Sequence, residues 1–128
     1  MKRIILLAFL CTTTLVMAQR INHVQEAIAN YDYEAALTLI AKEKPTIPLL
    51  LQKGKAQRGL GMNTEAVSTY QEIITNDTAN TRAYIEAAEC CRSLAKYQQA
   101  LKYYEQALDL NPENKYVRIQ YIGLLLSL

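Results

Sequence analysis

The sequence is poor in the side chains from which catalytic and metal sites are built. Its only histidine is His23, and no cysteine, serine or carboxylate stands beside it at the spacing of a metal site or a catalytic triad. Lys53-Gly54-Lys55 lacks the glycine-rich run of a phosphate loop. Glu86 and Glu89 share a helix face, as solvated carboxylates commonly do. We therefore predict no catalytic residue, no metal, no cofactor and no enzymatic activity.

No apolar run reaches the roughly 20 residues that a membrane span needs. The most apolar stretch, Ile4 to Val16, follows the charged pair Lys2-Arg3, and Ala18 precedes Gln19 at the position of a cleavage site. This pattern predicts a Sec signal peptide over residues 1–18, cleaved before Gln19. It also predicts an exported chain of the periplasm or cell envelope, with no transmembrane span in its mature form.

The mature chain has no surplus of charge and few cysteines. The 14 Lys and Arg residues include Lys2 and Arg3, so that the remaining 12 balance the 12 Asp and Glu residues. A neutral chain has no global field that would draw it onto nucleic acid or an anionic membrane, so we expect no nucleic-acid partner. Cys90 and Cys91 are neighbours, and a disulfide between them would break a helix. We expect both to be small buried side chains, with intermolecular pairing as the alternative.

The sequence lacks any strict apolar–polar alternation long enough for a strand and is helical in pattern throughout. Pro45 and Pro48 each forbid helix just before them. Together with other turn residues they divide the mature chain into helices that we expect over 21–29, 33–42, 48–58, 64–75, 81–94, 98–110 and 116–128. The mature chain is long enough for one small domain.

Small and large residues recur along these helices at a fixed repeat period. The period relates two sets of residues, which are Ala66, Tyr70, Ile73 and Thr78, and then Ala100, Tyr104, Ala107 and Pro112. Gly54 and Ala88 lie the same distance apart and place a small residue in the middle of each first helix, where two helices cross closely. A fixed period of this length, about 34 residues, is typical of a solenoid.

These residues resemble the tetratricopeptide repeat (TPR) family of protein-binding scaffolds. The resemblance implies an all-α, right-handed α-solenoid of about three helix pairs plus one C-terminal helix. It divides the chain into a degenerate first hairpin (19–46), two repeats (47–80 and 81–114), and a segment 115–128 that is the first helix of a further repeat or a docking helix.

The chain departs from the family pattern at several positions. Thr78 is not proline, Gln57 and Cys91 are not tyrosine, and there is no tryptophan. In the first hairpin Ala36 lies closer to Ala66 than Ala66 lies to Ala100. We therefore expect the second helix of that hairpin, or the loop after it, to be shorter by about one turn.

The resemblance also implies a groove, lined by the first helices, that holds an extended peptide or a partner helix. The family's groove positions fall on Leu51, Lys55, Arg58, Arg82, Ile85, Glu89 and Arg92. An arginine among them could bind an acidic side chain or a terminal carboxylate through paired N–H donors; the alternative is that these are ordinary solvated charges. The family's carboxylate clamp also uses asparagines, and these positions hold none, which argues against binding of chaperone tails.

Two further features point to modification and assembly. Asp77-Thr78-Ala79 resembles the acceptor sequence for O-glycosylation on exported proteins of some Gram-negative bacteria, with Thr78 as the acceptor. The last helix, from Tyr116 to Leu128, has nine large apolar residues in thirteen, more than one neighbouring helix covers. We predict that it begins a longer array or packs on another molecule, such as a second copy of the chain, through Tyr116, Ile119, Leu124, Leu125 and Leu128.

The sequence thus predicts an exported TPR scaffold for protein–protein interaction in the periplasm or cell envelope. Its partner would be a protein or peptide, with an acidic segment as the candidate contact. Two alternatives stay open, namely the N-terminal sensory or interaction part of a longer membrane-bound signalling protein, and a small self-assembling helical-repeat protein.

Overall fold

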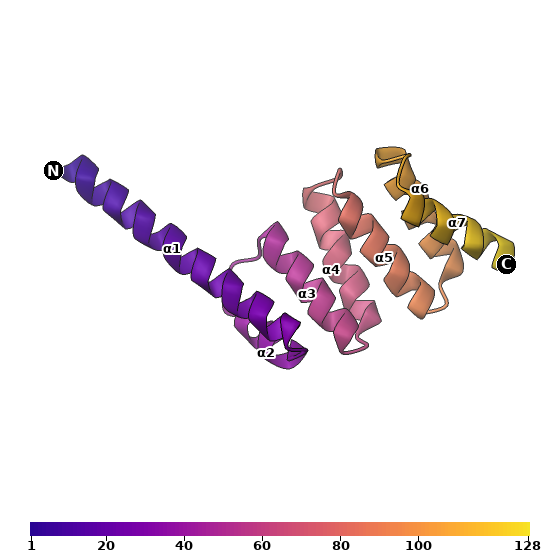
Figure 1. Ribbon diagram of the computed structural model, residues 1–128, viewed down its shortest axis with the longest axis horizontal. Helices are drawn as coiled ribbons and strands as arrows, with labels where there is room; N and C mark the ends of the chain where they lie inside the picture. The colour runs from indigo at the N-terminus through magenta and orange to yellow at the C-terminus, as the bar shows by residue number, and fades with distance from the viewer.

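A computed structural model describes the whole chain, residues 1–128, and contains seven α-helices and no strand. The helices are α1 (Lys2–Ala29), α2 (Tyr33–Ile40), α3 (Ile47–Gly59), α4 (Asn63–Asn76), α5 (Thr81–Ser93), α6 (Tyr97–Leu110) and α7 (Lys115–Ser127). Each helix packs on the next, so that the chain forms a row of hairpins (Figure 1). This confirms the predicted all-α solenoid.

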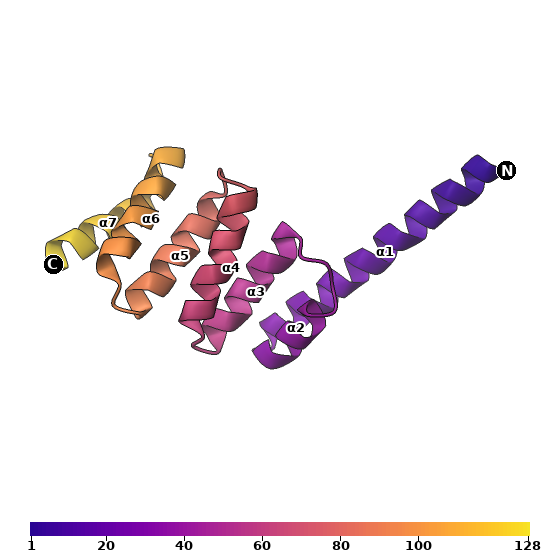
Figure 2. The same ribbon diagram turned by 180° about the vertical axis from the view of Figure 1, so that it is seen from behind.

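The helices divide between two faces of this row. The first helices of the second and third hairpins, α3 and α5, and the unpaired helix α7, which takes the place of a first helix, lie on the face turned to the viewer in Figure 1. The second helices, α2, α4 and α6, lie on the opposite face, which Figure 2 shows from behind. The helices therefore present two separate surfaces to solvent.

The helix α1 differs from the expected one because it does not begin at Ile21. It continues without a break from Lys2, since nothing between the two residues is a glycine or proline that would stop a helix. Every residue from Met1 to Arg20 is exposed, so the packed part of the protein begins at Ile21. By length and composition α1 is the one helix apolar enough to cross a membrane, a property that N-terminal signal sequences share.

The repeat period is visible in the local structure of the helix ends. The N-cap residues of α3, α5 and α7 are Thr46, Asn80 and Asn114, which are separated from one another by one period each. Each side-chain oxygen accepts a hydrogen bond from the backbone N–H three residues later, which satisfies one of the free donors of the first turn.

The turns inside the three hairpins are also equivalent. Each contains one residue with positive φ, namely Tyr31 (60°), Gly61 (75°) and Ala95 (57°). Two backbone hydrogen bonds close each turn on the preceding helix. Only Gly61 suits this left-handed conformation, so the other two hairpins form it against the preference of their residues.

The first hairpin is shortened where we expected it to be. The helix α2 has 8 residues, whereas α4 and α6 have 14 each. The loop that follows α2 (41–46) is two residues longer than the loop after α4 (77–80), and the two differences together account for the missing turn.

The core lies between the two layers of helices in two clusters, a larger one from α3 to α7 and a smaller one between α1, α2 and α3. The rings of Tyr70 and Tyr104 are almost fully buried in the larger cluster, at 1% and 0% exposure. A Cβ atom on Gly54 would lie 2.4 Å from Cζ of Tyr70, which confirms that this position of α3 requires a small residue. Cys90 and Cys91 are buried and free, as predicted.

Candidate functional site

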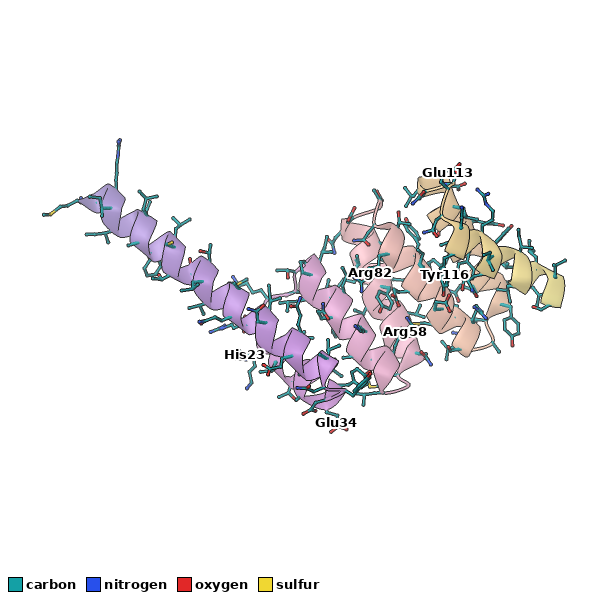
Figure 3. The ribbon with its side chains drawn as sticks, in the orientation of Figure 1. His23, Glu34, Arg58, Arg82, Glu113 and Tyr116 are labelled. Carbon is teal, nitrogen blue, oxygen red and sulfur yellow. The ribbon has the colours of Figure 1, made fainter.

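The seven predicted groove residues lie on one side of α3 and α5. Residues three and four apart share a face of a helix, which aligns Leu51, Lys55 and Arg58 on α3. The same spacing aligns Arg82, Ile85, Glu89 and Arg92 on α5. Figure 3 shows the labelled members Arg58 and Arg82 with Tyr116 of α7 on the side of the first helices. We call this surface the first-helix face.

An ion pair joins α3 to α5 on the first-helix face. Arg58 Nη1 donates a hydrogen bond to Glu86 Oε2, and both side chains are partly buried. Burial opposes the charge of the guanidinium, but the Glu86 carboxylate and its neighbours outweigh burial, so that the pKa of Arg58 is raised. Arg58 is therefore occupied within the protein.

The equivalent arginine one repeat later joins α5 to α7. Arg92 Nη1 donates to Gln120 Oε1 at 2.6 Å and lies 3.5 Å from Glu89 Oε2. Glu89 Oε1 accepts hydrogen bonds from the hydroxyls of Tyr104 (2.6 Å) and Tyr116 (3.0 Å). The pKa of both tyrosines is raised, mainly by burial and secondly by the hydrogen bond to Glu89. The charges of Glu89 and Arg92 are thus paired with each other, and both side chains also make hydrogen bonds to neighbouring residues.

Lys55 and Arg82 differ from the other charged residues of this face. The ion pairs of the chain involve Arg20, His23, Arg58 and Arg92 as cations, so neither Lys55 nor Arg82 has a carboxylate within 4.0 Å. Both side chains are exposed. The face therefore carries two positive charges with no acid of the protein within ion-pair distance.

The repeat indicates how these two cations are placed. Lys55 and Arg82 precede Glu89 and Tyr116 by one repeat period each, and the side chains of that later pair meet at 3.0 Å across the gap between first helices. The same backbone arrangement places Lys55 on α3 opposite Arg82 on α5. Two long cationic side chains at such positions can converge on one anionic group.

An apolar stripe accompanies these charges. Leu51, Ile85 and Ile119 occupy the same position of α3, α5 and α7, one repeat period apart. Leu51 and Ile85 are partly buried, and Ile119 is 67% exposed. The first-helix face thus combines an apolar stripe with one unpaired cationic site.

The predicted interface residues of α7 separate into two groups. Tyr116, Ile119, Leu125 and Leu128 are 53%, 67%, 46% and 60% exposed. Leu124 does not belong with them, because it is 7% exposed and packs into the core. It lies one repeat period after the buried Cys90 and takes the same inward position of its helix. The prediction of an interface at Leu124 is therefore wrong.

The remaining predicted residues lie apart from the first-helix face. Thr78 is exposed in the loop between α4 and α5, where Tyr84 Oη donates to its backbone oxygen at 3.1 Å and its own hydroxyl makes no hydrogen bond. His23 is exposed, with Nδ1 4.0 Å from Glu26 Oε2. The chain contains no group of three or more His, Cys, Asp or Glu residues that could hold a metal ion.

Sequence reasoning missed the partners of the groove arginines. The interpretation of Glu86 and Glu89 as solvated carboxylates is wrong, because both are partly buried and accept hydrogen bonds, and no role was predicted for Gln120. The pairs Arg58–Glu86 and Arg92–Gln120 have the same separation of 28 residues. That recurrence was the available signal, because a repeat that joins one first helix to the next must produce it at each step.

Comparisons with known proteins agree with this architecture. Residues 81–114 match the family model of the tetratricopeptide repeat. The chain is 30% identical over 89 residues to tetratricopeptide repeat protein 6 of Homo sapiens, an alignment that covers 70% of this chain and only 16% of that relative.

Solved structures share the fold at low sequence identity. One is the first TPR domain of Spaghetti (RPAP3) bound to the HSP90 peptide SRMEEVD, with a TM-score of 0.80, 19% identity and coverage of 86% of this chain and 90% of that chain. Another is the Yersinia enterocolitica type III secretion chaperone SycD in complex with a peptide of the translocator YopD, with a TM-score of 0.81, 16% identity and coverage of 88% and 94%.

Proposed function

Because this chain belongs to the tetratricopeptide repeat family, we propose that it is a non-catalytic scaffold that binds a protein partner through an extended peptide. The first-helix face is the binding surface. Its apolar stripe takes apolar side chains of the peptide, and Lys55 and Arg82 take an acidic side chain or a terminal carboxylate. The solved relatives that hold a peptide of HSP90 or of a translocator support this use of the fold.

The observation that carries this proposal is the unequal pairing of the cations. Arg58 and Arg92 are ion-paired or hydrogen-bonded within the protein, whereas Lys55 and Arg82 have no carboxylate within 4.0 Å. Two like charges across one gap repel each other, so an anion between them is stabilised by both. A hydrogen bond to a charged group contributes about 1.5–3 kcal/mol. Two such bonds suffice to select acidic peptides over neutral ones.

The test is a selection from a library of random peptides displayed as extended chains. We expect the bound peptides to be enriched in Asp, Glu or a free C-terminus beside apolar residues. The double variant Lys55→Met and Arg82→Met should lower the affinity for the selected peptide at least tenfold, which corresponds to about 1.4 kcal/mol of binding free energy.

The control for Lys55→Met is Lys53→Met, which removes one lysine charge from the other side of α3. It should leave the affinity for the selected peptide unchanged. Selected peptides without an acid, or an affinity that the double variant does not alter, would show that the cations do not form the binding site.

We also propose that the protein is exported to the periplasm or cell envelope, with residues 1–18 removed before Gln19. The exposure of all residues from Met1 to Arg20 supports this proposal, because the packed part of the protein loses nothing when that segment is cleaved. The first tertiary contact after the cleavage site is the ion pair of Arg20 Nη1 with Glu43 Oε1 at 2.8 Å. The competing arrangement retains α1 as a membrane anchor.

The intact mass of the protein purified from its own cells tests export and modification together. A mass equal to residues 19–128 supports cleavage, and a mass that includes residues 1–18 supports the anchor. An added mass of hexose units that the Thr78→Ala variant lacks would support glycosylation of Thr78, and a bare mass would exclude it.

A second candidate function, the interaction part of a longer protein, is favoured by the exposed apolar side chains of α7. Ile119, Ile122 and Leu126 are 67%, 47% and 85% exposed on that helix. A further helix of the same polypeptide or a second copy of the chain would cover them. The size of the native protein on an immunoblot, followed by its size as a function of concentration, distinguishes these two arrangements.

A further inference from the structure

A pocket of about 410 Å³ lies between the first two hairpins, on the side of the second helices. Its walls come from α2, α3 and α4, and its apolar part includes Leu37, Ile40, Leu49 and Leu50. The two polar residues of α3 that line it are Lys53 and Gln57. This size is within the range of small-molecule sites, which begins at roughly 300 Å³.

The pocket results from the shortened first hairpin. The helix α2 ends at Ile40, about one and a half turns earlier than the equivalent helices, because it has 8 residues rather than 14. The space beside α4 that a longer second helix would fill is left open. The opening between the next two hairpins, where α4 and α6 have 14 residues each, is smaller, at about 180 Å³, and most of the residues that line it are polar.

The pocket has a hydrogen-bond donor without a protein partner in its wall. Gln57 is only 7% exposed, and its Oε1 accepts a hydrogen bond from Thr69 Oγ1 at 2.7 Å. The amide thus lies with Oε1 toward Thr69, and Nε2 makes no hydrogen bond within the protein. Every fully enclosed side-chain polar atom does have a partner, so Nε2 is not fully enclosed, and the pocket is the opening that Gln57 lines. A nearly buried donor of this kind favours a ligand or water that accepts from it.

A second donor lies next to this amide. Lys53 precedes Gln57 by four residues and therefore shares its helix face. Its side chain is half-buried and has no carboxylate within 4.0 Å. Of the two acids at the rim, Glu43 is paired with Arg20 at 2.8 Å, and Glu72 on α4 lies beyond ion-pair distance of Lys53. Two adjacent donors thus stand at one end of an aliphatic wall.

We propose that this pocket binds a medium-chain aliphatic carboxylic acid. The carboxylate accepts hydrogen bonds from Gln57 Nε2 and Lys53 Nζ, and the hydrocarbon chain lies along Leu37, Ile40 and Leu50. The donors match a carboxylate because neither nitrogen accepts hydrogen bonds, and an ammonium adds charge to the bond. Burial of the chain against aliphatic side chains supplies the apolar part of the affinity.

This site is distinct from the peptide-binding surface. On a helix with 100° between residues, Lys53 and Gln57 point almost opposite to Lys55 and Leu51, which face the first-helix side. The scaffold would therefore bind a small molecule on one side of α3 and a peptide on the other. The proposal does not depend on the proposed peptide function.

The test uses the full chain labelled with ¹⁵N and titrated with decanoate below its micelle concentration. The readout is the side-chain amide resonance of Gln57, with the amide of Gln52 as an internal reference. A local readout is needed because the exposed apolar residues of α1 offer a second place for hydrocarbon chains. We expect a saturable shift at Gln57, and at least tenfold weaker effects from 1-decanol and decylamine, which lack the carboxylate.

Two variants and a matched control locate the site. Lys53→Met should weaken decanoate binding about tenfold, whereas Lys55→Met, two residues away on the opposite side of α3, should leave it unchanged. Ile40→Trp should fill the pocket and abolish the shift at Gln57, with the circular dichroism spectrum used to verify that the variant is folded.

The outcomes separate this proposal from the peptide function. A Gln57 amide that does not move, equal binding of 1-decanol, or binding that Lys53→Met leaves intact would each overturn it. Loss of peptide binding in Lys55→Met with retained decanoate binding would support both proposals. Loss of decanoate binding in Lys55→Met alone would contradict the pocket assignment.

Discussion

Replacement of Gly54 by alanine tests how the two layers of helices pack. In the middle of an exposed helix, Gly→Ala stabilises a protein by up to about 1 kcal/mol, because alanine has the better helix propensity. Gly54 is instead buried against the ring of Tyr70. Its added Cβ would lie 2.4 Å from Cζ, 2.7 Å from Cε1 and 2.8 Å from the hydroxyl oxygen of that ring.

The magnitude follows from how little Tyr70 can move. The ring is 1% exposed, so it cannot swing into solvent, and all three contacts are shorter than any normal carbon contact. Overpacking of this kind costs about 1–3 kcal/mol. Three contacts this short place the cost in the upper part of that range, at about 2–3 kcal/mol. After subtraction of a propensity gain of about 1 kcal/mol, we expect Gly54→Ala to lower the free energy of unfolding by about 1–2 kcal/mol.

Gly123 provides the matched control. A Cβ at Gly123 in α7 meets nothing within 4 Å, so the same exchange there acts only through propensity. We expect Gly123→Ala to raise the free energy of unfolding by about 0.5–1 kcal/mol. Opposite signs for the same chemical change would isolate the effect of the Tyr70 ring.

The assay is urea unfolding followed by far-UV circular dichroism, with the midpoint compared at constant m-value. A double-mutant cycle with Tyr70→Leu should give a coupling of at least about 0.5 kcal/mol, because the smaller side chain makes room for the Cβ. If Gly54→Ala were as stable as the wild type, or if the cycle showed no coupling, the close approach of α3 and α4 would not be what requires glycine.

Three further results are expected. Ala95→Gly should raise stability by about 1 kcal/mol, because Ala95 has φ 57° and glycine adopts this conformation without strain; an unchanged melting temperature would contradict this. Asn80→Ala should lower the free energy of unfolding by about 1 kcal/mol, because the N-cap of α5 is lost. Equilibrium unfolding measures this change, and an unchanged stability would show that the cap is dispensable. Stability should fall as the pH rises from about 9 towards 11, because burial raises the pKa of the Cys90 thiol to about 11 from its ordinary 9.0. The unfolded thiol ionises in that window while the folded one stays protonated, so each pH unit costs on the order of 1 kcal/mol. Cys90→Ala should reduce the slope of urea midpoints between pH 9 and 10, below the range in which Tyr70 and Tyr104, whose pKa values burial also raises, begin to contribute. An equally steep loss there would assign it to other groups.

The sequence determined the helical hairpins and their period. The recurrence of Ala66 at Ala100, and of Gly54 at Ala88, sufficed to predict which helices pair and where small residues are needed. Such features are local or repeat along the chain, so the order of residues contains them completely. The shortening of the first hairpin could likewise be predicted from the sequence, because a missing helical turn changes the spacing between equivalent residues.

The tertiary structure decided which charges are free. Arg58, Arg82 and Arg92 are indistinguishable in sequence, yet only Arg82 lacks a partner within the protein. The partners Glu86 and Gln120 come from the next first helix, 28 residues away. Which side chains meet across that distance depends on how two helices are placed relative to each other, and the composition of neither helix contains this information.

The same distinction applies to the pocket and to α7. The sequence predicted a shortened α2 but not the space beside α4, since a void is defined by the walls of three helices at once. It predicted an apolar α7 but assigned Leu124 wrongly to its open side. Hydrophobicity is a property of each residue, whereas burial depends on what packs against it. The sequence therefore determined the repeat and its apolar faces, and only the tertiary structure decided which of those faces and charges remain available to a partner.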